Sequence, residues 1–272
     1  MEPKYFDIHA HVNFKAYDED RDAVIRRAID EGVHIMNVGT QQKTSAFAVE
    51  MAEKYGHGVY AAVALHPIHT SSSFHDTSEL GPEGKAFTSK GEKFDPDFYE
   101  ALARKDVVKA IGECGLDYYR LDESTAKLQA EVFRQHIELA NKVNKPLMCH
   151  IRNAYKDAAE ILREHAKVKG DIHFFAGNWE EAQLFLNMGF TLSFTGVITF
   201  THDYDEVVRN TPLDMILSET DCPYITPTPF RGQRNEPIHV REIVKAIARI
   251  KGEDEEKVRA QLVANAKRVF GF

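Results

Sequence analysis

Residues 107–151 read VVKAIGECGLDYYRLDESTAKLQAEVFRQHIELANKVNKPLMCHI, and this stretch contains the unit from which the fold is built. Its first part, 107–111, is a short apolar run that predicts a buried strand. Residues 125–143 form a long amphipathic segment that predicts a helix, and residues 146–151 are a second apolar run. A strand, a helix and another strand in this order are typical of a parallel sheet covered by helices.

The same alternation extends in both directions from this stretch. The sequence predicts eight strands, at residues 5–9, 34–38, 59–65, 107–111, 146–151, 171–174, 191–194 and 215–218. It predicts helices at residues 19–31, 43–55, 97–104, 125–143, 157–167, 179–188, 203–209, 239–250 and 254–269. Eight strands, each followed by a helix, predict an α/β fold, a (β/α)8 TIM barrel that spans residues 1–272 as a single domain. The alternative is an open doubly wound sheet, which typically has a Gly-rich phosphate loop that this sequence lacks.

Composition and charge limit the functions that the chain can have. It carries 34 Lys and Arg against 42 Asp and Glu, a formal net charge of −8. The surface as a whole is not expected to attract nucleic acid, although divalent cations bound in one cleft can reverse the local field. Three cysteines do not make a disulfide framework, and we find neither a secretory signal nor an apolar run of about 20 residues. We therefore expect a cytoplasmic protein without a membrane segment, and no obligate protein partner is evident.

Residues 68–96 interrupt the alternation. They contain serines, glycines and charges with little periodicity, and they predict a long surface loop. Because the loop follows the third strand, it could overhang the active-site rim and affect substrate choice. A tolerated surface insertion is the alternative.

Six side chains suited to divalent metals stand at predicted strand ends. His9 and His11 close the first strand, and strand alternation points them to the same side as Asp7. The other four end or follow the fourth, fifth, sixth and eighth strands: Glu113, His150, His173 and Asp221. In a barrel these ends meet at one rim, so all six would converge on one cleft. Four imidazoles and two carboxylates suit two ions, with Glu113 as the bridge, whereas each residue taken singly could be a core histidine or a helix cap.

Each of the three cysteines is adjacent in sequence to one of these candidates. They are Cys114, Cys149 and Cys222. Neighbours in an extended segment face opposite sides, so the cysteines are predicted to point toward the helices as small buried hydrophobic groups. Thiolate ligation of the metal is the alternative.

Three arginines are candidates for binding an anionic substrate. Arg152 lies two residues after His150 and on the same face if the strand continues. Arg231 and Arg234 lie in the segment after the eighth strand. Guanidinium groups match phosphate oxygens, but a plain surface position or an ion pair with a carboxylate such as Glu236 is the alternative.

One histidine and three aromatic residues complete the candidate list. His66 ends the third strand, and it could contact substrate, orient a metal ligand or pack against Pro67. Trp179, Phe174 or Phe175 could stack on a nucleobase. Phe174 and Phe175 must point in opposite directions if the chain is extended, so core packing is the favoured interpretation for this group.

Seven blocks, which cover nearly the whole chain, resemble the TatD-type metal-dependent deoxyribonucleases within the larger class of metal-dependent barrel hydrolases. They are DIHAH at 7–11, ALHP at 64–67, IGECGLDY at 111–118, PLMCHIRNA at 146–154, HFFAG at 173–177, SFTGVITF at 193–200 and ETDCPYITPTPFRGQRNEP at 219–237. The third and the last are the most specific. The second usually begins with glycine and here begins with Ala64, and the segment at 68–96 is longer than usual.

The resemblance implies a barrel with one or two divalent ions (Mg²⁺, Mn²⁺ or Zn²⁺) that hydrolyses phosphodiester bonds at the 3′ end of DNA, or of RNA. The family's metal ligands carry over onto six positions of this sequence: His9, His11, Glu113, His150, His173 and Asp221. In the mechanism we expect, the ions activate a water. Asp221 acts as the general base, and Glu113 bridges the ions and assists the leaving group.

Two other functions fit part of this pattern. A hydrolase of the same fold could act on an amide, a lactone or a D-aminoacyl-tRNA ester. Glu113 stands where many barrel amidohydrolases have a bridging carbamylated lysine, and this favours the nuclease-like group. A protein that binds metal or nucleic acid without catalysis is the other alternative, and the complete ligand set and the acidic charge disfavour it.

Overall fold

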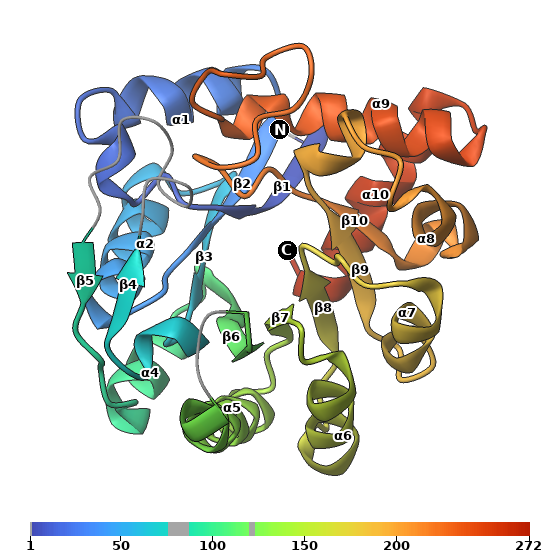
Figure 1. The fold of residues 1–272 in the computed structure, drawn as a ribbon. Helices are drawn as coiled ribbons and strands as arrows, with labels where there is room; N and C mark the ends of the chain where they lie inside the picture. The colour runs from blue at the N-terminus through green and yellow to red at the C-terminus, as the bar shows by residue number, and fades with distance from the viewer. Residues whose placement is uncertain (1, 76–86, 120–122) are drawn as a thin grey trace.

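In a computed structural model of the chain, which describes residues 2–75, 87–119 and 123–272, eight parallel strands form one sheet that is rolled into a nearly closed barrel (Figure 1). The strands follow one another around the barrel in the order β1-β2-β3-β6-β7-β8-β9-β10. Their bounds are β1 Tyr5–Ala10, β2 Val33–Val38, β3 Val59–Val63, β6 Val108–Asp117, β7 Leu147–Arg152, β8 Gly170–His173, β9 Thr191–Phe194 and β10 Ile216–Ser218.

Helices surround the strands and alternate with them along the chain (Figure 1). They are α1 Arg21–Asp30, α2 Gln42–Tyr55, α4 Pro96–Ala103, α5 Glu123–Val143, α6 Tyr155–His165, α7 Trp179–Leu186, α8 Asp205–Asn210, α9 Val240–Lys251 and α10 Glu255–Phe270. Short 3-10 turns are η1 Lys15–Tyr17, η2 Pro67–His69, η3 Gly196–Thr199, η4 Leu213–Met215 and η5 Pro237–His239. The predicted single-domain (β/α)8 barrel is therefore confirmed. Among the described residues, none of the helices combines the length and the apolar character that crossing a membrane requires.

Backbone hydrogen bonds between the first and last strand segments complete the barrel. Ala10, the last residue of β1, forms an isolated parallel bridge with Cys222, which follows β10. The His11 N–H donates to the Cys222 carbonyl at 2.8 Å, and the Asp221 N–H donates to the His9 carbonyl at 2.9 Å. Closure thus places Asp221 beside His9 and His11, although more than two hundred residues separate them in sequence.

Two buried clusters occupy the two sides of the barrel wall. The cluster inside the barrel draws alternate residues from β1, β2, β3, β6, β7 and β10: Phe6, Ile8, Met36, Val38, Ala62, Ala110, Met148 and Leu217. Phe272 covers this cluster at the amino ends of the strands, and its ring centroid lies 4.3 Å from that of Phe6. The second cluster lies between the strands and the helices, and it includes Cys114, Cys149 and Cys222. The predicted orientation of the cysteines toward the helices is confirmed.

The structure departs from the sequence-based prediction at three places. β6 continues to Asp117 instead of ending near residue 111. The predicted loop at 68–96 contains η2 and two short antiparallel strands, β4 Ser73–His75 and β5 Phe87–Ser89, while residues 76–86 lie outside the described part of the chain. On β1 the register shifts between Asp7 and Ala10, so alternation does not run through this segment. Asp7 accepts hydrogen bonds from the N–H and hydroxyl of Thr220.

A buried histidine connects α5 to the end of the third strand. The Leu65 N–H donates to His136 Nε2 at 3.0 Å, so the ring proton resides on Nδ1, which donates to the Val132 carbonyl at 2.8 Å. Burial lowers the pKa of His136 to about 4. The neutral imidazole is therefore part of the folded structure, and it fixes the backbone next to His66.

Acidification should destabilise the fold through His136. The unfolded chain protonates this imidazole near pH 6.5 and the folded chain only near pH 4, so its contribution is complete above pH 6.5 and is lost as the pH falls toward 4. The shift corresponds to about 3 kcal/mol in the free energy of unfolding. Urea denaturation measures this loss as a lower midpoint at acidic pH.

A variant that cannot be protonated provides the control. His136→Gln retains a side-chain acceptor for the Leu65 N–H but does not titrate. Its urea midpoint should change less between neutral and acidic pH than that of the wild type. Equal changes in the two proteins would show that His136 does not carry this acid sensitivity.

Candidate metal centre

The six predicted metal ligands come together at the carboxyl end of the barrel. His9 lies in β1, Glu113 in β6 and His150 in β7, while the others end a strand or follow one. Three groups of ligand atoms lie within 4.8 Å of one another: His9, His173 and Asp221; His9, His11 and Glu113; and His66, Glu113 and His150. Side chains from positions as far apart in the sequence as 9 and 221 thus meet in one cluster.

Glu113 is at the centre of this cluster, and its two oxygens face different sides. Oε2 lies 3.4 Å from His9 Nε2 and 3.7 Å from His11 Nε2. Oε1 lies 2.7 Å from His150 Nδ1 and 3.5 Å from His173 Nε2. Burial raises the pKa of Glu113, but the surrounding imidazoles outweigh burial and hold it well below its usual value. Glu113 is therefore an ionised carboxylate that can serve two positions at once.

Asp221 joins the Oε2 side of the cluster. Its Oδ1 lies 3.4 Å from His11 Nε2 and 3.8 Å from His9 Nε2. Burial opposes its ionisation, but the neighbouring histidines lower the pKa of Asp221 below its usual value. It is thus a second ionised carboxylate beside the imidazoles of β1.

Hydrogen bonds on the outer side of the rings determine which nitrogen faces the cluster. His11 Nδ1 donates to the Val38 carbonyl at 3.0 Å, and His173 Nδ1 lies 2.9 Å from Glu219 Oε2. Both rings therefore direct Nε2 inward. His11 Nε2 is only 3.1 Å from His9 Nε2. Two imidazole lone pairs at this distance repel each other unless a cation or a proton lies between them, so the donor set fits a divalent metal ion.

His173 shows how strongly this cluster favours positive charge. Burial alone would lower its pKa, but the Glu219 and Glu113 carboxylates raise the pKa of His173 to about 10. Burial likewise opposes charge on His150, yet Asp117 and Glu113 raise its pKa to about 9. The carboxylates thus create a negative environment that a bound cation would neutralise.

His66 contacts the central carboxylate but is not one of the six predicted metal ligands. Its Nδ1 accepts a hydrogen bond from the Ile68 N–H at 3.1 Å, so in the neutral ring the proton is on Nε2. Burial lowers the pKa of His66, which favours the neutral form. Nε2 then donates to Glu113 Oε1 at 3.1 Å. His66 therefore orients the central carboxylate, one of the alternatives that its sequence position left open.

Two carboxylates of the centre, Glu219 and Asp117, are not among the residues predicted from the sequence. Glu219 accepts from the Phe174 N–H at 2.7 Å and holds His173. Asp117 Oδ2 lies 3.0 Å from His150 Nε2. No strand signal marked either residue in the sequence: Asp117 lies in the part of β6 beyond the predicted strand, and Glu219 follows the end of β10, where Asp221 has a φ of 52°.

The three predicted substrate-binding arginines have different surroundings. Arg152 lies over the Tyr119 ring and Arg231 over the Phe200 ring. Arg234 forms ion pairs with Asp20 at 2.6 Å and with Glu236 at 3.4 Å. The guanidinium charge of Arg234 is thus neutralised by carboxylates of the protein.

The three aromatic candidates also differ in their surroundings. Phe175 is 1% exposed and packs against Tyr155, while Trp179 packs against the core. Phe174 is partly exposed, with its ring centroid 6.0 Å from that of His173. Phe174 and Phe175 differ in their surroundings, but Phe174 follows the end of β8 and has a φ of 45°, so the extended segment assumed in the prediction is not present.

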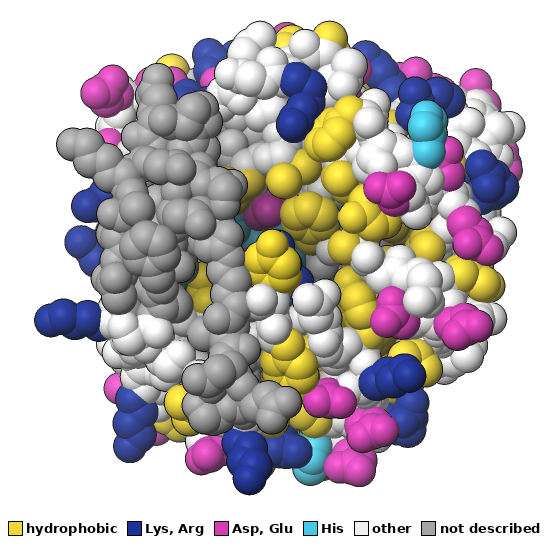
Figure 2. Space-filling view, in the orientation of Figure 1, with side chains coloured by type: hydrophobic (Ala, Val, Ile, Leu, Met, Phe, Trp, Pro, Cys, Tyr) yellow, Lys and Arg dark blue, Asp and Glu magenta, His cyan; other side chains and the backbone are white. Residues whose placement is uncertain are grey.

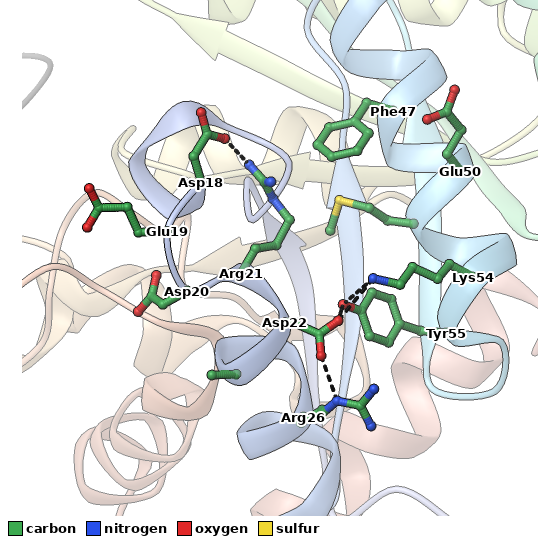
Figure 3. A pocket seen from close by; sticks show the side chains of 12 residues that line it. Asp18, Glu19, Asp20, Arg21, Asp22, Arg26, Phe47, Glu50, Lys54 and Tyr55 are labelled. Carbon is green, nitrogen blue, oxygen red and sulfur yellow. Dashed lines mark hydrogen bonds and ion pairs between the residues drawn. The ribbon is translucent and has the colours of Figure 1, made fainter.

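A surface pocket lies away from this cluster, between η1, α1 and α2 (Figure 3). Asp22 pairs there with Arg26 at 2.7 Å and with Lys54 at 3.0 Å, and Asp18 pairs with Arg21. The charges of this pocket largely neutralise one another. None of the predicted site residues lines it.

An eight-stranded barrel with histidines and carboxylates gathered around one buried glutamate at its carboxyl end defines the class of metal-dependent barrel hydrolases. Comparison with known proteins gives the family. The family model described as TatD related DNase matches residues 6–271. YabD of Bacillus subtilis, an uncharacterized metal-dependent hydrolase, is 40% identical over 97% of this chain and 98% of its own. The chain belongs to the TatD family of metal-dependent hydrolases.

Further relatives agree with this assignment. The uncharacterized metal-dependent hydrolase TatD of Mycobacterium tuberculosis is 33% identical over 98% of this chain and 97% of its own. The crystal structure of YJJV, a TATD homolog from Escherichia coli k12, superposes with a TM-score of 0.85 at 26% identity and covers all of both chains.

Removing the charge behind His173 should weaken metal binding. Glu219→Gln can still accept a hydrogen bond from His173 Nδ1, but the amide no longer makes the ring a stronger donor toward the metal. We expect the affinity for Mn²⁺ or Zn²⁺ to fall about tenfold or more, as for other partners of metal-bound histidines. Calorimetric titration of the metal-free protein measures this, with the exposed Glu180→Gln on α7 as control. Equal affinities in the two variants would contradict the assigned position of Glu219.

Proposed function

We propose that this protein is a divalent-metal-dependent phosphodiesterase that removes nucleotides from the 3′ end of DNA. The observation that carries the proposal is the bifurcated contact of Glu113, whose two oxygens face two separate sets of imidazoles. Such a carboxylate suits two ions held side by side, an arrangement that favours the in-line displacement at phosphorus. The description of the matching family model, TatD related DNase, supports the same reaction.

The residues of this chain would divide the chemistry between them. Bound divalent ions would supply Lewis acidity and lower the pKa of a water. His9, His11 and Asp221 would hold one ion on the Oε2 side of Glu113, and His150 and His173 would hold the other on the Oε1 side. Mg²⁺, Mn²⁺ and Zn²⁺ are the candidate ions, and the four imidazoles favour Mn²⁺ or Zn²⁺.

Asp221 is placed to move the proton. Its carboxylate is ionised at neutral pH, and its side chain is 13% exposed, whereas that of His9 is fully buried. It can therefore accept a proton from the attacking water at the open side of the cluster. Arg152, at the end of β7, would offset the negative charge that develops on the phosphate oxygens.

Loss of this base should abolish turnover and preserve the fold. Asp221→Asn keeps the size of the side chain but removes its basicity, so the rate of nucleotide release should fall by about two to four orders of magnitude. The measurement is release of nucleotide from 3′-labelled single-stranded DNA by metal-loaded protein, with the thermal midpoint recorded in parallel. Turnover close to that of the wild type would rule out Asp221 as the general base.

Removal of the metal should also abolish cleavage. Treatment with a chelator should stop nucleotide release, and titration with Mg²⁺, Mn²⁺ or Zn²⁺ should restore it to different extents. A D-aminoacyl-tRNA serves as the competing substrate in the same assay. Metal-dependent deacylation without DNA cleavage would replace the nuclease with an esterase of the same fold, and chelator-insensitive DNA binding without cleavage would replace it with a binding protein.

A further inference from the structure

We propose that two arginine–aromatic pairs on the rim of the metal centre bind unpaired nucleotides next to the reacting phosphate. The first pair is Arg152 with Tyr119, and the second is Arg231 with Phe200. This inference rests on the proposed phosphodiesterase function and names the form of substrate that the centre accepts, a flexible single-stranded end.

The first pair continues directly from the metal centre. Arg152 Cζ lies 3.7 Å from the centroid of the Tyr119 ring, and the two residues stand at the carboxyl ends of the neighbouring strands β7 and β6. The Tyr118 N–H donates to the Arg152 carbonyl at 2.9 Å, and the Tyr119 N–H donates to Asp117 Oδ1 at 2.9 Å. The carboxylate that holds His150 therefore also fixes the backbone of Tyr119.

The second pair is built from the segments that follow β9 and β10. Arg231 Cζ lies 4.0 Å from the centroid of the Phe200 ring, and Nη1 donates to the Thr226 carbonyl at 2.8 Å. The Thr228 N–H donates to Thr199 Oγ1 at 2.9 Å and joins the two segments. The loop that carries Arg231 begins at Asp221, so this pair is also attached to the metal centre.

The rings at both positions are unusually exposed. Tyr119 is 50% and Phe200 44% exposed, and Leu128 is the other large hydrophobic side chain exposed to this degree in the described residues. Figure 2 shows hydrophobic side chains gathered around the hollow at the centre of the face shown. Exposed aromatic rings beside a catalytic cleft provide flat surfaces on which bases can stack.

The charges at the rim match a phosphate backbone. Within the part of the chain that the structure describes, neither Arg152 nor Arg231 forms an ion pair, whereas Arg234 contacts two carboxylates. A guanidinium that lies flat on a ring keeps its N–H groups at the edge, where they can donate to phosphate oxygens. Each pair thus offers a stacking surface for one base and donors for the adjacent phosphate.

The spacing of the pairs around the barrel determines the substrate. The first pair stands at the ends of β6 and β7, and the second comes from the segments that follow β9 and β10, while β8 with His173 lies between these two sets of strands. The two pairs therefore contact different nucleotides of one strand. Bases within a duplex are already stacked and paired, so this rim selects unpaired ends.

Substitutions that remove only the aromatic face test the proposal. Tyr119→Leu and Phe200→Leu keep an apolar side chain, while Tyr119→Phe and Phe200→Tyr keep the ring. For each variant, kcat/KM is measured on 3′-labelled single-stranded DNA and on bis(p-nitrophenyl) phosphate, which is too small to span the rim. In each Leu variant, kcat/KM on DNA divided by kcat/KM on the small diester should fall about tenfold. The ring-retaining variants should keep the wild-type ratio.

An arginine–aromatic pair at the opposite end of the barrel provides a matched control. Arg259 lies over Tyr5, the first residue of β1, and Arg259→Ala should keep the wild-type ratio, whereas Arg231→Ala should lower it. An unchanged ratio in both Leu variants would overturn the proposal. So would a wild type that cleaves the small diester but not DNA.

Failure of the proposed function gives a different result. In that case the metal-loaded wild type cleaves neither substrate. Binding of fluorescent single-stranded DNA, measured by anisotropy, then tests the rim alone. Weaker binding by Phe200→Leu than by Phe200→Tyr supports the rim site, and equal binding overturns it.

Discussion

A single buried carboxylate, that of Glu113, is the group on which the arrangement of the active centre depends. It is 4% exposed, and an ionised carboxylate in such a position is costly unless charged or hydrogen-bonding partners surround it. Those partners come from β1, β7, β8 and the end of β3, so the ionisation of one residue requires the barrel to be correctly closed. The hydrogen bonds from the Asp221 N–H to the His9 carbonyl and from the His11 N–H to the Cys222 carbonyl complete that closure and bring Asp221 to the same point.

The partners of the imidazoles extend this constraint outward. The Val38 carbonyl orients His11, Glu219 orients His173, and the Ile68 N–H orients His66. Each of these groups contacts the outer nitrogen of a ring, and each decides whether the ring offers a lone pair or a proton to the centre. The donor set therefore depends on hydrogen bonds formed behind the rings as much as on the ligands themselves.

The sequence could predict the barrel and the six candidate ligands because both follow from periodicity and from the position of strand ends. It could not predict the length of β6, since the residues after Ile111 include two glycines, which ordinarily disfavour strands. The structure shows why glycine is needed: a Cβ at Gly112 would lie 2.5 Å from that of Met148, and one at Gly115 would lie 2.0 Å from the His150 carbonyl oxygen. Close approach of β6 to β7 is a tertiary requirement that no local pattern contains.

The surroundings of polar residues outside the ligand set were likewise not predictable from residue type. Arg152, Arg231 and Arg234 are the same residue type, and all three lie over aromatic rings. Only the structure shows that Arg234 also pairs with Asp20 and Glu236, whereas no ion pair of the other two appears among the described residues. This distinction bears on the proposed anionic substrate, which a protein with a net charge of −8 would not attract. An acidic protein and a polyanion repel each other at long range, so in the proposed function recognition would occur at short range. It would use the cation-binding centre and the guanidinium groups of Arg152 and Arg231, which form no ion pair within the described residues. The proposed stacking on Tyr119 and Phe200 would be insensitive to net charge, and it would hold a nucleic acid end that this surface could not attract by electrostatics alone.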